Sequence, residues 1–262
     1  MHSMMSNTSK ELAPERQARI ADFVRGKGVV RIKELLAAFP VSIATLRRDL
    51  DVLEKQGRIR KVHGGAVFQD QKLQEPLFDD KTAIASEEKK RIAAKALSLI
   101  EPGDSIYLDG GSTVLELAHM LAHRNDITVA TNSLRAAIAL SGRGPRLILI
   151  GGELRRLSQT TVGTLTRLVL HEIRVVKAFM GTMGFALPEG PTTSDPNEAY
   201  TKKMVMERAD QVILMMDSSK AGKKAFARSG NARHINTIIS DHGFPAPLAK
   251  AAAKLGISVE CV

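Results

Sequence analysis

The stretch Val41–Leu50, VSIATLRRDL, decides the fold of the first part of the chain. Ser42 stands just before a helical pattern, where its hydroxyl can accept a hydrogen bond from a backbone amide, so we predict an N-cap. Leu46, Leu50 and Leu53 then recur at spacings of four and three residues, which predicts a helix with one apolar stripe. Such a helix either reads a DNA major groove or is an ordinary surface helix, and its neighbours in the sequence decide between the two.

Helical patterns precede this stretch and a basic hairpin follows it. Residues 14–28 and Lys33–Phe39 have helical spacing, and Pro40 ends the second of these helices. We expect the helix of the opening stretch to end at Gly57. Beyond it, RIRKVHGGAV gives two extended segments around a Gly64-Gly65 turn. Two short helices with a tight connection are typical of a helix-turn-helix, and the added hairpin is typical of a winged helix.

Small, polar and basic side chains of this module are expected to face DNA, from the leading turn and solvent side of the helix and from the hairpin. They are Ser42, Ala44, Thr45, Arg47, Arg48, Arg60, Lys61 and His63. Residues 1–72 hold 14 Lys and Arg against 8 Asp and Glu, which favours a polyanionic partner. Asp49 would be repelled by phosphates, so we predict that it pairs with an arginine inside the module.

The composition limits the other chemistries that this chain can perform. Its 262 residues suggest two domains, and the net charge is +10. Cys261 is the single cysteine, which excludes an intramolecular disulfide and a cysteine zinc site, and the seven His lack ligand spacing. The sequence holds no GxxxxGK[ST], HExxH or GxSxG motif, so we predict no cofactor, no metal site and no catalytic residue.

Location and domain limits follow from polarity along the chain. No apolar run approaches the roughly 18 residues of a membrane span, and the start of the chain lacks the apolar centre of a signal peptide. We therefore expect a cytoplasmic protein without membrane contact. We assign residues 1–13 to a polar tail, 14–68 to the DNA-binding module, 69–80 to a linker and 81–262 to a larger domain.

The larger domain has the pattern of a mainly parallel α/β, Rossmann-like fold. We expect Ser86 to cap a helix whose first turn holds Glu87 and Glu88. Short apolar runs then alternate with helical segments, which predicts a parallel sheet with right-handed crossovers. The apolar runs are Ser105–Leu108, Ile127–Ala130, Arg146–Ile150, Lys177–Met180, Val212–Met216, Thr237–Ser240 and Ile257–Val262.

Small and polar residues follow these strands, at the edge where parallel sheets bind ligands. Examples are Asp109-Gly110-Gly111-Ser112-Thr113 and Asp217-Ser218-Ser219-Lys220. Glycine lets a ligand approach the backbone, and helix N-termini offer amide donors to an anion. Each such loop could equally be a simple turn, and Asp109 and Asp217 could simply cap helices. Together the loops describe a site for a small phosphorylated, hydroxyl-rich molecule.

Motifs along nearly the whole chain resemble the DeoR family of bacterial transcription regulators. In the module they are ERQARI, VSIATLRRDL, LEKQG and VHGGAV; in the larger domain they are DGGST, TNS, GGELRRLSQTTVG, TSDPNEAYTKK and DSSKAGKKAFA. The resemblance implies a winged helix-turn-helix and an effector-sensing domain similar to ribose-5-phosphate isomerase. Met183 and Pro191 depart from the family pattern. The residues implied in effector binding are Asp109, Gly110, Gly111, Ser112, Thr113, Asn132, Gly152, Lys202, Asp217 and Lys220.

We therefore expect a repressor of a carbohydrate-utilisation operon that binds double-stranded operator DNA and responds to a phosphorylated sugar. Reading two half-sites calls for a homo-oligomer, a dimer or a tetramer. Two other interpretations remain open. One is a sugar-phosphate isomerase with a basic appendage, in which Asp109 or Glu198 would be the base. The other is an architectural DNA-binding protein whose larger domain binds no ligand.

Overall fold

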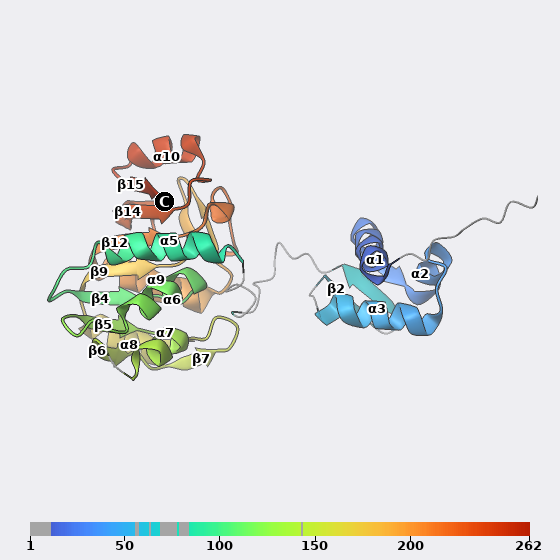
Figure 1. Cartoon of the computed structure of the whole chain (residues 1–262), viewed down its shortest axis with the longest axis horizontal. Helices are drawn as coiled ribbons and strands as arrows, with labels where there is room; N and C mark the ends of the chain where they lie inside the picture. Colours follow the sequence, from blue (N-terminus) through green and yellow to red (C-terminus); the bar gives the residue numbers. More distant parts are fainter. Residues whose placement is uncertain (1–11, 56–57, 63, 69–77, 79–83, 143) are drawn as a thin grey trace, which may run out of the picture. The chain divides into compact units, whose positions relative to one another are not determined.

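The computed structural model describes residues 12–55, 58–62, 64–68, 78, 84–142 and 144–262. It divides into two compact units, Met1–Gln74 and Glu75–Val262, and each is described by itself (Figure 1). Most of the predicted tail and linker lies outside the described residues, so their limits stay predictions. Among the described residues, no helix combines the length and the apolar character needed to cross a membrane.

The first unit has the predicted helices and hairpin. Its elements are α1 (Ala13–Lys27), β1 (Val29–Arg31), α2 (Ile32–Ala38), α3 (Ile43–Lys55), β2 (Ile59–Val62) and β3 (Gly65–Phe68). The described strands form an antiparallel sheet in the order β1-β3-β2, so β1 adds a strand to the hairpin. Gly28, at φ 73°, ends α1, whereas Gly26 lies inside that helix. Gly57, the expected end of α3, lies outside the described residues.

Two predicted details of α3 are confirmed. The backbone N–H of Thr45 donates to the hydroxyl of Ser42 over 3.1 Å, so Ser42 caps the helix. The buried carboxylate of Asp49 accepts from Arg16 Nε over 2.7 Å and from Gln17 Nε2 over 2.9 Å. Leu46, with Leu50 and Leu53, is buried in the core of this unit. Apolar packing and one charged pair therefore hold α3 against α1.

The second unit is a three-layer α/β/α domain. Within the described part of the chain, strands run parallel in the order β15-β14-β12-β9-β4-β5-β6. They are β4 (Ser105–Leu108), β5 (Thr128–Thr131), β6 (Arg146–Leu149), β9 (Val175–Met180), β12 (Ala209–Met215), β14 (Thr237–Ser240) and β15 (Ser258–Cys261). These strands match the seven predicted apolar runs to within a few residues. The sequence-based prediction of a parallel sheet is confirmed.

Helices cover both faces of this sheet (Figure 1). One core lies under α5 (Ser86–Leu97), α6 (Ser112–Leu121) and α7 (Leu134–Leu140). The other lies under α8 (Thr164–Glu172), α9 (Pro196–Glu207) and α10 (Ala246–Ala253). Successive residues of β4 serve opposite cores: Ile106 and Leu108 belong to the first, and Tyr107 to the second. Central strands are therefore buried on both sides, which explains their continuous apolar runs.

The structure corrects one prediction and adds elements that the sequence did not indicate. Ser86 is the first residue of α5 rather than its cap, because Ala85 occupies the N-cap position in a left-handed conformation without a side-chain bond. The added strands are β7 (Glu153–Arg155) with β8 (Thr160–Val162), and β10 (Gly184–Ala186) with β11 (Gly190–Thr193) and β13 (Ala227–Arg228). Short helical turns are η1 (Ser218–Lys220) and η2 (Ala232–His234). Pro191 lies within β11 and Met183 directly precedes β10.

The pair between Arg16 and Asp49 gives a test of what holds α3 in place. We expect Asp49→Asn to destabilise the first unit by about 2–3 kcal/mol, because it removes the buried counter-charge of Arg16 and replaces one of two acceptor oxygens with a donor. Hydrogen exchange of the α3 amides in the full chain would measure this. The control is Asp51→Asn, since Asp51 lies on the same helix but is paired with Lys61 near the surface. Equal protection in both variants would contradict a structural role for Asp49.

Candidate functional site

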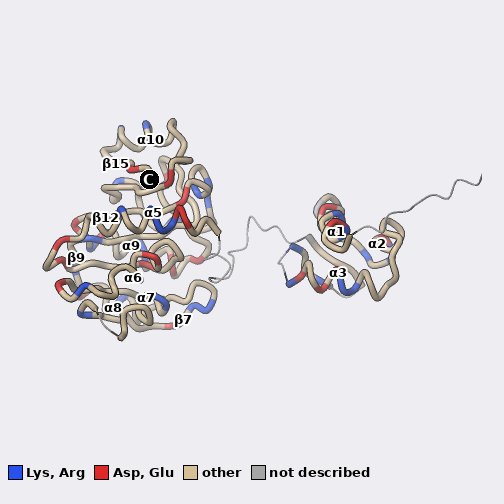
Figure 2. The backbone as a smooth tube through the Cα atoms, in the orientation of Figure 1, with Lys and Arg blue, Asp and Glu red and all other residues tan. Residues whose placement is uncertain are grey.

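The exposed side of α3 carries most of the predicted DNA-contacting residues. Ser42, Ala44, Arg47 and Arg48 are exposed, and Thr45 is half-buried with its hydroxyl 2.9 Å from that of Ser42. Both arginines lie on α3, which has blue segments in Figure 2. The opposite side of α3 is buried. The helix thus presents small, polar and basic groups in one stretch, as a groove reader requires.

The structure describes only some of the hairpin residues that are predicted to contact DNA. His63 and the side chain of Arg60 lie outside the described residues, so their roles stay predictions. Lys61 forms ion pairs with Asp51 and Glu54 of α3, the second at 3.8 Å, and its backbone N–H donates to Glu54 over 2.8 Å. The hydrogen bond to Asp51 raises the pKa of Lys61 above its usual value. In this structure Lys61 therefore ties the hairpin to the reader helix.

The larger unit has a buried ion pair at the carboxyl end of its central strands. Lys202 of α9 pairs with Asp109, which directly follows β4, and the two side chains are 4% and 3% exposed. Lys202 Nζ also donates to the carbonyl of Gly181 over 3.2 Å, and Gly181 N donates to Asp109 Oδ2 over 2.9 Å. Three elements far apart in the sequence therefore meet at one carboxylate.

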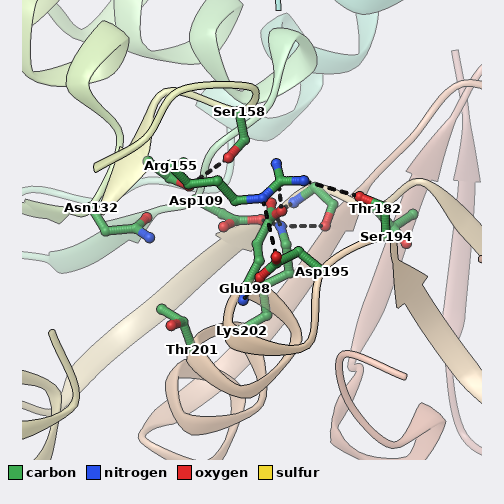
Figure 3. Close-up of polar contacts among 12 residues, drawn as sticks. Asp109, Asn132, Arg155, Ser158, Thr182, Ser194, Asp195, Glu198, Thr201 and Lys202 are labelled. Carbon is green, nitrogen blue, oxygen red and sulfur yellow. Dashed lines mark hydrogen bonds and ion pairs between the residues drawn. The ribbon is translucent and has the colours of Figure 1, made fainter. Parts of the chain in front are cut away.

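Arg155 extends this network, and sequence reasoning did not single it out. Its guanidinium lies 3.5 Å from Asp195, 3.4 Å from Glu198 and 3.3 Å from the Ser194 hydroxyl. Glu198 is in turn 3.8 Å from Lys202. Figure 3 shows Arg155 reaching from the strand β7 toward the loop that begins α9. The alternating charges link the β7–β8 hairpin to the central ion pair.

The glycine-rich loop before α6 is tightly built. Gly111, at φ 133°, occupies the N-cap position of α6, and a Cβ atom at Gly110 would collide with the Thr160 methyl group. Ser112 and Thr113 follow in the first turn and are buried. Among the described residues, the Thr113 hydroxyl has no hydrogen-bond partner. A buried hydroxyl of this kind at a helix N-terminus is a ready donor and acceptor for a ligand.

Asn132 and Gly152 follow the next two strands of the sheet, β5 and β6. Tyr107 donates its hydroxyl to Asn132 Oδ1 over 2.7 Å, and Asn132 Nδ2 donates to the Thr161 carbonyl over 2.8 Å. Burial raises the pKa of the Tyr107 hydroxyl well above its usual value, so this donor stays protonated. A Cβ atom at Gly152 would collide with the Thr166 hydroxyl, so packing alone explains that glycine.

Asp217 and Lys220 form a second cluster after β12, two strands from β4 in the sheet, and β9 lies between these strands. Lys220 Nζ lies 3.3 Å from Asp217, and Ser219 N donates to the same carboxylate over 3.2 Å. Burial opposes ionisation of Asp217, yet the nearby Lys220 charge and hydrogen bonds hold its pKa below the usual value. The predicted effector residues are thus divided between two clusters.

Arg155 and Asp195 of the central network were not singled out from the sequence, and Glu198 was named only as a possible base. Arg155 belongs to the quoted GGELRR run, but nothing in that run shows that its hairpin folds back toward α9. Asp195 caps α9 by accepting from Glu198 N over 2.9 Å, and the SDP sequence before a helix could have indicated this. Glu198 pairs with Lys202 one turn along α9 and with Arg155 from a distant part of the chain.

The charged side chains of this network are paired with one another. Lys202 and Arg155 offer two cations beside the amide donors of the α6 N-terminus, and both are already balanced by carboxylates. Asp109 Oδ2 already accepts from Lys202 and Gly181, so that oxygen is occupied rather than available as a base. In the described part of the chain, no group of three or more His, Cys, Asp or Glu side chains is placed to hold a metal ion.

Comparison with known proteins identifies both units. Residues 16–72 match the DeoR-like helix-turn-helix domain, and residues 84–242 match the DeoR C-terminal sensor domain. An uncharacterized HTH-type transcriptional regulator of Bacillus subtilis, YulB, is 36% identical over 96% of this chain and 97% of its own length. A putative aga operon transcriptional repressor of Escherichia coli O157:H7 is 33% identical over 94% of this chain and 92% of its own length.

Two further matches concern a sugar-related repressor and a solved structure. A lactose phosphotransferase system repressor of Streptococcus mutans is 36% identical over 87% of this chain and 91% of its own length. The solved ribose 5-phosphate isomerase A of Methanocaldococcus jannaschii is 19% identical, with a TM-score of 0.40, over 52% of this chain and 54% of the isomerase. That structural likeness is too weak to support a function.

The central ion pair gives a stability prediction. We expect Lys202→Met to destabilise the second unit by about 3–5 kcal/mol, because it leaves Asp109 buried without its counter-charge. The double variant Lys202→Met with Asp109→Asn should recover part of this loss, since no buried charge is then left over. Urea unfolding of the full chain would measure both.

The neighbouring lysine supplies the control for this experiment. Lys203 lies on the same helix but is exposed, 3.8 Å from Glu207. Lys203→Met should therefore change stability little. Asp109→Asn alone completes the set, and additive effects of the two single changes would show that the pair does not act as a unit.

Proposed function

This chain belongs to the DeoR family of transcription regulators, and from that membership we propose that it represses a carbohydrate-utilisation operon until a phosphorylated sugar releases it from operator DNA. The proposal rests on one observation above the others. A family-matched helix-turn-helix with an exposed basic reader helix is joined in one chain to a family-matched sensor domain. Relatives named as aga operon and lactose phosphotransferase system repressors support the sugar connection.

The DNA contacts are assigned to one side of α3 and to the hairpin. Arg47 and Arg48 are exposed cations beside the small leading turn of Ser42, Ala44 and Thr45. The inward side of α3 packs in the core and carries the buried Asp49. Only its outer side is therefore accessible to the major groove. Arg60 and His63 complete the proposed set as phosphate contacts, while Lys61 positions the hairpin.

The effector is assigned to the loop before α6 and the charged network beside it. A phosphate group would take the amide donors and hydroxyls of Gly110–Thr113, and sugar hydroxyls would meet Asn132 and the side chains around Lys202. Because Lys202 and Arg155 are held by carboxylates, an incoming anion would compete for them. Rearrangement of those ion pairs is the proposed link between ligand and DNA affinity, since the ligand must favour one arrangement over another.

The DNA assignment predicts the behaviour of an Arg48→Ala variant. We expect weaker operator binding, and a salt dependence shallower by about one unit of slope if Arg48 contacts a phosphate. Fluorescence anisotropy on an operator selected from random duplexes would measure both. Arg174→Ala is the control, because Arg174 is an exposed arginine of the second unit. Unchanged affinity at every salt concentration would remove Arg48 from the interface.

The effector assignment predicts opposite effects of one substitution on stability and on ligand binding. Thr113→Val keeps the shape of the side chain and removes a buried hydroxyl that has no partner among the described residues, so the ligand-free protein should be no less stable. Effector binding should weaken about 10-fold, because the ligand loses a hydrogen bond. Thermal-shift titration against a panel of phosphorylated sugars would measure the two effects together.

Thr131→Val is the matched control for this variant. Thr131 is also a buried threonine, but its hydroxyl donates to the Leu108 carbonyl over 2.7 Å and accepts from Ser133 N over 3.0 Å. That change should cost about 1–3 kcal/mol of stability. If no phosphorylated sugar shifts the melting temperature of the unmodified protein, the proposed effector class is wrong. Turnover of a sugar phosphate would instead support an isomerase.

A further inference from the structure

We propose that two copies of this chain pair through an exposed apolar surface on α8, with the two α8 helices antiparallel about a twofold axis. This α8 surface consists of Leu165, Leu168 and Val169 together with Tyr200 of α9. Leu165 and Leu168 are 66% and 58% exposed, and Val169 is also exposed. Thr166 and Leu170, on the inner side of α8, are buried. A helix that is apolar on both sides normally has a packing partner on both sides.

The residues bordering α8 extend this surface. The guanidinium of Arg167 stacks over the Tyr200 ring, 4.5 Å from its centroid, and Tyr200 is 44% exposed. Stacked arginine and aromatic side chains are typical of the centres of protein interfaces. The end of β6 also borders α8, because the Thr166 hydroxyl donates to the Gly151 carbonyl over 2.8 Å. The surface therefore continues from α8 onto α9 and the edge of the sheet.

The size of the surface suits a partner that covers more than one helix. α8 has nine residues, so it is about 14 Å long, and a stable interface buries about 1,200–2,000 Å² in total. An α8 pair alone would be too small. Leu154 of β7 is a large apolar residue that is half exposed. With Tyr200 it supplies additional area.

The charges at the two ends of α8 favour a second copy as the partner. The first turn of α8 has no acidic residue, so its amide groups leave a partial positive charge. Glu172 ends the same helix, where its carboxylate opposes the helix dipole and the Arg208 guanidinium donates to the His171 carbonyl over 2.6 Å. In an antiparallel pair centred on Leu168, Glu172 of the partner subunit would lie over the first turn near Thr164. The surface is thus complementary to itself, as a twofold interface must be.

A dimer would also supply the two DNA-binding modules that a symmetric operator needs. This argument for a second copy as the partner rests on the proposed function. One winged helix reads one half-site, and two modules are needed for a symmetric operator. The location of the interface is independent of that function, because it follows from exposure and charge on α8 alone. Mass measurement without DNA therefore tests the interface, and DNA titration tests the function. A dimer that binds no operator would contradict only the proposed function.

Leu168→Glu is the first test, because it places a charge at the centre of the proposed interface. Sedimentation equilibrium at micromolar concentrations should show a dimeric or larger unmodified protein, and the variant should have a dissociation constant about 100-fold higher. Leu255→Glu is the matched control, since Leu255 is 44% exposed away from this surface, in the segment before β15. A monomeric unmodified protein, or a Leu168→Glu variant of unchanged mass, would overturn the proposal.

A cross-link keeps the proposal testable if Leu168→Glu fails to fold. Cys261 is the single cysteine of the chain and is exposed, so a Cys261→Ser background allows one cysteine to be placed at will. Leu168→Cys in this background should form a covalent dimer under mild oxidation, because a residue on the axis meets its own copy. Leu255→Cys should remain monomeric on a denaturing gel. Equal cross-linking of both variants, or of neither, would overturn the arrangement.

A charge exchange tests the antiparallel direction. Thr164→Glu and Glu172→Lys should each weaken the dimer, the first by repulsion from Glu172 of the partner subunit and the second by repulsion from the positive helix end. The double variant should restore it, because the new Glu and Lys then face each other across the interface. If the double variant is weaker than both single variants, the helices do not pair antiparallel.

Discussion

The buried ion pair between Lys202 and Asp109 is the interaction on which the sensor unit depends. Two opposite charges can be buried only if they satisfy each other, and removing either would leave the other without compensation. This requirement fixes α9 against the ends of β4 and β9, because Gly181 supplies both an acceptor and a donor to the same pair. Positions 109, 181 and 202 are thereby held together at the carboxyl edge of the sheet, where α/β domains bind ligands.

The first unit also depends on a buried charged pair. Asp49 is buried and receives Arg16 and Gln17 from α1, so α3 cannot turn about its own axis without breaking a charged hydrogen bond. Lys61 adds a surface pairing between α3 and the hairpin. Together they set the side of α3 that faces outward. In both units a buried carboxylate fixes the position of a helix.

The network around Arg155 joins β7, the start of α9 and the Lys202–Asp109 pair. Arg155 lies on β7, pairs with Asp195 and Glu198 at the start of α9, and through Glu198 reaches the Lys202–Asp109 pair. An anion that attracts either cation alters the balance of charges on several elements at once. α8 lies between this region and the proposed surface, since it follows β8 directly and packs beside α9. Ligand binding and subunit pairing would therefore share the same elements.

Much of this protein was determined by local sequence patterns. The cap at Ser42, the stripe of α3 and the seven parallel strands follow from hydrogen-bonding groups and apolar periodicity that lie within a few residues of one another. Asp49 was predictable too, because a carboxylate near DNA needs an internal partner. The motif at Asp109–Thr113 indicated an anion site for the same local reason, a small-residue loop at a helix N-terminus.

Only the tertiary structure decided which distant residues meet. The contacts between Asp109 and Lys202, and between Arg155 and Glu198, join positions that no spacing rule connects, since they depend on strand order and on a hairpin of irregular loops. The N-cap of α5 is Ala85 rather than the predicted Ser86, because backbone conformation rather than side-chain type determines where that helix begins. The sequence also did not indicate that one apolar side of α8 is exposed. Its leucines look like core residues until the fold shows that the core lies on the other side.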